Sequence, residues 1–127
     1  MTRPDKPRQN LLLASLPDAE WERWKPQLEL MDLPLGKVLY ESGEQMKFVY
    51  FPTSGIVSLL YVLNSGASAE IAVVGNEGVV GISLFMGGGS TPSRAVVQSA
   101  GMGYRLPAAA VQAEFAESGP VMHLLLR

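Results

Sequence analysis

The sequence predicts a mainly β domain with helices at both ends, folded as a sandwich or barrel. Two observations carry this prediction. Between residues 28 and 106, short apolar runs alternate with turn residues about every eight to twelve positions, a spacing typical of β sandwiches and barrels. Apolar side chains recur at helical spacing only near the two ends of the chain.

The composition fits one small domain. A chain of 127 residues can enclose one hydrophobic core. Hydrophobic residues make up 47% of the chain and charged residues only 17%, so part of its surface is expected to meet another molecule, most simply a second protein chain. The net charge is −2 and the ten basic residues are scattered, which argues against a nucleic-acid-binding surface on this chain.

Two absences in the sequence narrow the class further. The chain has no cysteine, which excludes disulfides, thiolate metal sites and cysteine nucleophiles and suits a reducing compartment. No stretch reaches the roughly 18 unbroken apolar residues of a membrane span, and no apolar signal-peptide core follows the polar start. We therefore expect a cytoplasmic protein outside the membrane, with residues 1–9 as a flexible N-terminal arm.

The first predicted helix covers about residues 18–25. Ser15 stands where a helix-capping side chain is expected, with Asp18 three residues later. Trp21 and Trp24 are three residues apart, so they share one side of this helix. We interpret the pair as a packing face rather than as a stacking platform for a base.

The clearest predicted strand pair is a hairpin. Residues 56–63 are nearly all apolar, Asn64-Ser65-Gly66 is a three-residue loop signal, and residues 67–74 return as a strand. Apolar and polar positions alternate in the returning strand, so one face is expected to be buried and the other partly wet.

The stretch over residues 75–98 concentrates groups that could bind a small molecule. It holds Gly81, a run of three glycines, the hydroxyls of Ser90, Thr91 and Ser93, and Arg94, the only charge between Glu77 and Arg105. Glycine backbones approach anions closely, and an arginine offers a fork of donors that matches a phosphate. Gly, Ser, Thr and Pro clusters between apolar runs are usually turns, so the residues alone favour a long hairpin loop over a binding site.

Two further strands are predicted over residues 95–97 and 103–106. Pro107 then opens a helix where its missing N–H costs nothing, and Ser118-Gly119 ends it. We expect Val111 on the inner face of this helix.

A last helix is predicted from Pro120. Its apolar residues Val121, Leu124 and Leu125 recur at helical spacing. Because so short a helix is marginal alone, we expect it to belong to a longer element or to pack against a partner chain.

Three motifs stand in a fixed order along the chain. They are residues 35–44, a strand followed by a Gly-Glu turn; residues 49–57, an aromatic-rich strand and turn; and residues 78–81, followed by Leu84-Phe85 and Arg94-Ala95-Val96. With them, the chain from about residue 11 to its end resembles the N-terminal sensor domain of the CRP/FNR family of bacterial transcription regulators. The resemblance implies the cyclic-nucleotide-binding-domain fold, a double-stranded β-helix or jelly-roll barrel, over residues 10–119.

In nucleotide-binding members of that family, the segment after the matching glycine is a phosphate-binding cassette. A glutamate accepts from the ribose 2′-hydroxyl, and the arginine of an Arg-Ser-Ala triplet grips the cyclic phosphate. The resemblance places the candidate cassette at Gly81, Ile82, Ser83, Ser93, Arg94 and Ala95. A cyclic nucleotide is the one cofactor candidate that it implies.

This chain departs from the cassette at two positions. Ile82 stands where the glutamate is expected, and the unpaired ribose hydroxyl would cost about 1–3 kcal/mol in a buried site. The register of Arg94 is ambiguous by one residue, and in a strand one residue reverses the face to which a side chain points.

Other chemistries find little support in the residues. Haem-binding and iron–sulfur members of the family carry histidine or cysteine ligands, but the one histidine of this chain, His123, falls on the last predicted helix. Metal-dependent barrel enzymes of the cupin type need a histidine cluster, so no metal site is predicted. No histidine lies near Ser83, Ser90 or Ser93 in sequence, and no enzyme activity is predicted.

The resemblance implies a regulatory relay. An unknown small-molecule effector in the barrel would repack a dimerisation helix and re-aim a C-terminal helix-turn-helix on DNA, in a homodimer. Only the start of that helix, at residues 120–127, and no DNA-binding domain stand in this sequence, so we expect a truncated chain that senses without binding DNA. The alternative is a degenerate barrel that binds no nucleotide and serves only for dimerisation or protein docking.

Overall fold

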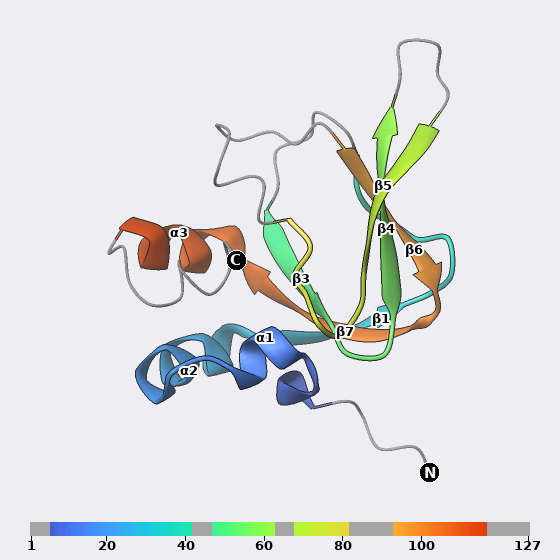
Figure 1. The fold of residues 1–127 in the computed structure, drawn as a ribbon. Helices are drawn as coiled ribbons and strands as arrows, with labels where there is room; N and C mark the ends of the chain where they lie inside the picture. Colours follow the sequence, from blue (N-terminus) through green and yellow to red (C-terminus); the bar gives the residue numbers. More distant parts are fainter. Residues whose placement is uncertain (1–5, 42–46, 63–67, 82–92, 117–127) are drawn as a thin grey trace.

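The computed structural model describes residues 6–41, 47–62, 68–81 and 93–116 and confirms the mainly β prediction (Figure 1). These residues form two antiparallel sheets, one of three strands in the order β1-β7-β3 and one of four strands in the order β2-β6-β4-β5. The strands are β1 (Glu29–Leu33), β2 (Val38–Tyr40), β3 (Phe48–Pro52), β4 (Ile56–Val62), β5 (Ser68–Val74), β6 (Ser93–Ser99) and β7 (Gly101–Pro107).

Helices flank the three-stranded sheet, as Figure 1 shows. Those in the described residues are α1 (Leu11–Ala14), α2 (Asp18–Trp24), α3 (Ala108–Ala116) and the 3-10 helices η1 (Pro7–Gln9) and η2 (Lys25–Gln27). The short helix η1 lies within the segment that was expected to be a flexible arm. The predicted helix over residues 18–25 is confirmed as α2.

The predicted cap of α2 was wrong. Its N-cap residue is Pro17, whereas Ser15 ends the preceding helix α1. Ser15 Oγ donates a 2.8 Å hydrogen bond to the carbonyl oxygen of Leu11. Ser15 therefore belongs to the end of α1. The prediction failed because α1 was not foreseen from the sequence.

The predicted hairpin is confirmed as β4 and β5. The two strands pair antiparallel from Val57 opposite Val74 to Val62 opposite Ser68. Its loop, over residues 63–67, lies outside the described residues. The other edge of β4 pairs with β6, which places the predicted strand over residues 95–97 at the centre of the four-stranded sheet.

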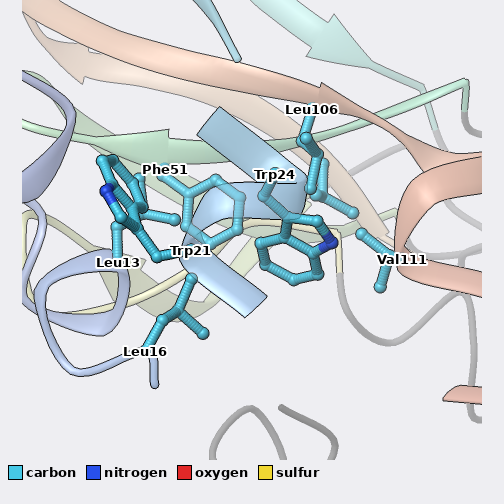
Figure 2. Close-up of a cluster of buried hydrophobic side chains, with 8 residues drawn as sticks. Leu13, Leu16, Trp21, Trp24, Phe51, Leu106 and Val111 are labelled. Carbon is cyan, nitrogen blue, oxygen red and sulfur yellow. The ribbon is translucent and has the colours of Figure 1, made fainter. Parts of the chain in front are cut away.

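The helix cluster is the buried core between the helices and the three-stranded sheet (Figure 2). In it the ring centroids of Trp24 and Phe51 lie 6.0 Å apart, which confirms the tryptophan pair as a packing face. Its members are Leu13, Leu16, Trp21, Trp24, Val49, Phe51, Leu106 and Val111.

The barrel cluster is the second buried core and joins the two sheets. Tyr50, on β3 between Val49 and Phe51 of the helix cluster, packs against it from the three-stranded sheet. Alternating residues of β3 thus face the two cores, as the period of a strand requires. The buried members of the barrel cluster are Tyr40, Val57, Val80, Ala95 and Ala108.

The helix α3 touches both cores. Ala108 belongs to the barrel cluster, and Val111, three residues later, to the helix cluster. The helix begins one residue later than predicted because Pro107 is still the last residue of β7, where it pairs with Phe48. Positions 117–127, with Val121, Leu124, Leu125 and His123, lie outside the described residues.

Candidate functional site

Residues 75–81 lead into the candidate cassette, and backbone pairing fixes their path. Tyr50 N donates to Val80 O at 2.9 Å, and Val80 N donates to Tyr50 O at 2.8 Å, so the segment is joined to β3. Gly75 N donates to Glu77 Oε1 at 3.1 Å. Glu77 therefore closes a local turn before the cassette.

A buried asparagine holds the same segment from the other side. Asn10 is completely buried, and its Nδ2 donates to the carbonyl oxygens of Gly78 and Pro52, both at 2.8 Å. Its Oδ1 accepts from the backbone N–H groups of Leu12 and Leu13 at 3.0 and 3.2 Å. One side chain thus caps α1 and ties it to the end of β3 and to the segment before Gly81.

Sequence reasoning missed this role of Asn10. The signal was present, because an asparagine directly before an apolar run is a strong N-cap candidate. The distant partners of its amide group leave no local trace in the sequence.

Gly81 stands at the end of the fixed segment with φ of 110° and is buried. Side chains of L residues strain this backbone region, which glycine adopts freely. The next candidates, Ile82 and Ser83, lie outside the described residues.

Described residues on both sides of positions 82–92 belong to the barrel cluster. Val80, beside Gly81, and Ala95 on the far side are both fully buried members of that cluster. The described residues next to the candidate cassette on both sides, Val80 and Ala95, therefore pack into the same core.

Arg94 is paired with a carboxylate. Its Nε lies 3.2 Å from Glu41 Oε1, and its Nη2 donates to Glu41 Oε2 at 3.4 Å. Glu41 directly follows β2, and Tyr40 pairs with Ala95, so Glu41 and Arg94 lie opposite each other across the two strands. The sequence analysis did not identify Glu41 as the partner of Arg94, because a cross-strand partner cannot be identified without the register.

The register of β6 shows on which face of the four-stranded sheet Arg94 lies. Ala95 pairs with Leu59 and Arg94 with Leu60, and Ala95 is fully buried in the barrel cluster. Because successive side chains of a strand point to opposite faces, Arg94 is on the face away from that cluster. Ser93 is the first residue of β6 and pairs with Tyr61.

The part of the chain that the structure describes shows neither a metal site nor a membrane helix. No group of three or more His, Cys, Asp or Glu side chains in it could hold a metal ion. None of its helices has the length and apolar character needed to cross a bilayer.

Comparison with known proteins identifies the fold. A family profile described as "Cyclic nucleotide-binding domain" matches residues 30–118. A search among curated protein sequences found no match.

Several solved structures are similar to this chain. The N-terminal domain of a transcriptional regulator from Streptomyces coelicolor is 24% identical, with a TM-score of 0.68 over 97% of this chain and 86% of that one. The sensor domain of the transcriptional regulator DNR from Pseudomonas aeruginosa is 18% identical, with a TM-score of 0.74 over 91% and 77%. The catabolite activator protein of Thermus thermophilus is 21% identical, with a TM-score of 0.72 over 91% of this chain and 54% of that protein.

Proposed function

We propose, because this chain belongs to the cyclic nucleotide-binding domain family, that it is the effector-sensing domain of a CRP/FNR-like transcription regulator. The observation that carries the proposal is the likeness of nearly the whole chain to N-terminal and sensor domains of transcriptional regulators. A cyclic nucleotide is a ligand compatible with this family. The proposed role is binding and relay, without catalysis.

The effector site is proposed to lie between Gly81 and the first residues of β6. Support comes from Val80 and Ala95, which lie on either side of the undescribed positions 82–92 and are both buried in the barrel cluster. Gly81 supports the same location, since its buried backbone with positive φ permits close approach of a ligand.

The relay is proposed to pass through α3. Its first residue, Ala108, packs in the barrel cluster with Ala95, and Val111 packs against Trp24 in the helix cluster. A ligand that displaces the barrel cluster would therefore shift α3 against α2, because close-packed cores transmit small displacements.

Beyond α3, the proposal includes a homodimer and DNA. We infer that Val121, Leu124 and Leu125 contribute to a dimerisation helix, and that a separate helix-turn-helix domain contacts DNA. A gel shift in which the 127-residue chain alone bound DNA at physiological salt would contradict this division of labour.

The sensing role is tested by hydrogen exchange. The chain is first screened for thermal stabilisation by cyclic AMP, cyclic GMP and the neutral dye Nile red, and any stabilising compound is then added in an exchange experiment. We expect slower or faster exchange within Ala108–Ala116 on binding. If no compound changes the melting temperature, or α3 exchanges identically with and without it, the relay is wrong.

A second candidate function is a protein-docking module without a ligand. The observation that favours it is a row of neighbouring side chains that runs across the outer face of the four-stranded sheet. In this row Val38 pairs with Val96, and Ser58 pairs with both Val96 and Val73. Val38 and Val73 remain 37% and 46% exposed. Sedimentation would test it by comparing the self-association of wild type with that of the double variant Val38→Lys/Val73→Lys. Only docking through this face predicts that the double variant loses self-association.

A further inference from the structure

We propose that the effector of this barrel is an uncharged, mainly apolar molecule rather than a cyclic nucleotide held by its phosphate. This inference rests on the proposed function, because it specifies the ligand class of the same site. It begins from the position of Arg94.

The Arg94 guanidinium already has an anionic partner. Two of its nitrogens lie 3.2 and 3.4 Å from the two oxygens of Glu41. The side chain of Arg94 is 30% exposed and that of Glu41 is 54% exposed, so the pair is partly exposed, although Arg94 Nε itself is buried and makes no hydrogen bond. A ligand phosphate would have to compete with a carboxylate that stands directly opposite on the neighbouring strand.

The face of the strand separates Arg94 further from the ligand. In the Arg-Ser-Ala triplet the arginine stands two residues before the alanine and shares its face. Here Ala95 is buried in the barrel cluster, and the arginine stands only one residue before it. One residue of offset puts the guanidinium on the opposite face of β6.

Three other described cations, Arg105, Lys37 and Lys47, do not replace it. Arg105 donates to both oxygens of Glu29 at 3.0 to 3.1 Å, so its charge is also compensated. Lys37 and Lys47 are exposed. Of the segments outside the described residues, 42–46, 63–67 and 82–92 contain no Lys or Arg, whereas 1–5 and 117–127 contain Arg3 and Arg127.

Arg94, Arg105, Lys37 and Lys47 thus offer no cationic partner to a phosphate buried at the inner face, and burying an uncompensated charge is strongly unfavourable. Position 82 adds to this, because Ile82 offers no acceptor to a ribose hydroxyl. The residues of this chain do not fit a cyclic nucleotide bound through its sugar and phosphate.

The described inner face suits a different ligand. Leu39, Leu59 and Val74 pack against the barrel cluster and are only half-buried. The buried members contributed by the four-stranded sheet are Tyr40, Val57 and Ala95. Apolar surface of this kind gains free energy when an apolar ligand covers it, about 25 cal/mol per Å².

The first experiment tests the phosphate. Wild type, Arg94→Ala and Glu41→Gln are titrated with cyclic AMP by calorimetry. We expect none to bind more tightly than about 1 mM. Wild-type binding below about 100 µM that Arg94→Ala weakens about tenfold or more would overturn the proposal, and so would tight binding that the substitution leaves unchanged.

The second experiment tests the neutral ligand with Nile red, by its fluorescence. We expect saturable binding to wild type and about tenfold weaker binding to Leu59→Glu, which puts a charge on the inner face. The matched control is Gln98→Glu, at an exposed position on the outer face of the same sheet, which should bind as wild type does. Circular dichroism establishes that both variants fold. Absence of saturable binding, or equal loss in the two variants, would overturn the proposal.

The two proposals fail differently. Cyclic AMP binding through Arg94 would refute the neutral ligand and leave the sensing role standing. Failure of both probes to bind would remove the support for a sensor altogether and favour the docking module.

Discussion

Asn10 and Gly78 are 68 residues apart in sequence, yet Asn10 Nδ2 donates a 2.8 Å hydrogen bond to the carbonyl oxygen of Gly78. The same amide group donates to Pro52 O. The N-terminal helix α1 and the segment that leads to Gly81 are therefore fixed relative to each other by one buried side chain.

Asn10→Ala should lower the free energy of unfolding by about 3 kcal/mol. The helix cap contributes about 1 kcal/mol, and each of the two donated bonds a similar amount. Asn10→Ser, which keeps a cap acceptor and loses the amide donor, should fall between alanine and wild type in a urea titration. A serine variant as stable as wild type would show that the bonds to Gly78 and Pro52 contribute nothing.

Trp24 offers an unusual pair of substitutions, because its buried Nε1 has no hydrogen-bond partner. An unsatisfied buried donor costs about 1–3 kcal/mol of stability. Trp24→Phe removes that cost, and this gain offsets much of the stability lost with the packing against Phe51. We expect it to lie within about 1 kcal/mol of wild type, whereas Trp24→Ala should cost about 3–5 kcal/mol. Equal losses in guanidinium unfolding would mean that the indole N–H is satisfied in solution.

Gly101 and Gly36 should respond differently to alanine. A Cβ at Gly101 would lie 2.5 Å from the carbonyl carbon of Ser54 and 2.6 Å from Gly55 Cα, and neither backbone atom can move cheaply. Gly101→Ala should therefore cost about 3 kcal/mol.

At Gly36 the backbone has φ of +85° and nothing lies within 4 Å of a Cβ. Gly36→Ala should cost only the strain of that conformation, about 1 kcal/mol. Thermal unfolding of both variants checks the contrast, and a Gly101 variant as stable as the Gly36 variant would contradict it.

Arg105 stacks on Phe48, with its Cζ atom 4.0 Å from the centroid of the ring. Its Nε and Nη2 donate a fork of hydrogen bonds to the carboxylate of Glu29. Lysine cannot reproduce the fork, so Arg105→Lys should lose up to about 1 kcal/mol, the range of half-exposed ion pairs. The difference should shrink in 1 M salt, since screening weakens exposed pairs. A loss that salt leaves unchanged would assign the effect to the Phe48 contact alone.

The sequence predicted the hairpin of β4 and β5, the helix α2 and the packing of Trp21 and Trp24, because each depends on residues close together in the chain. It did not predict α1 or its cap Asn10, whose main partners are distant. The candidate cassette was predicted from its motif, but the face of β6 to which Arg94 points was not predicted. That face depends on the pairing of β6 with β4. A motif match whose register is ambiguous by one residue cannot determine it.

The pairing order of the two sheets has a consequence for synthesis of the chain. Among the described strands, β6 pairs with β2 and β4, and β7 pairs with β1 and β3, so these last two strands complete both sheets. Residues 1–92 can form the β4–β5 hairpin, but they leave the partner edges of β1, β2 and β3 open until β6 and β7 emerge. Long-range pairing of this kind slows folding and exposes strand edges. A nascent chain stalled before residue 93 should therefore be protease-sensitive and prone to aggregation, and protection should arise in one step once residue 107 has left the ribosome.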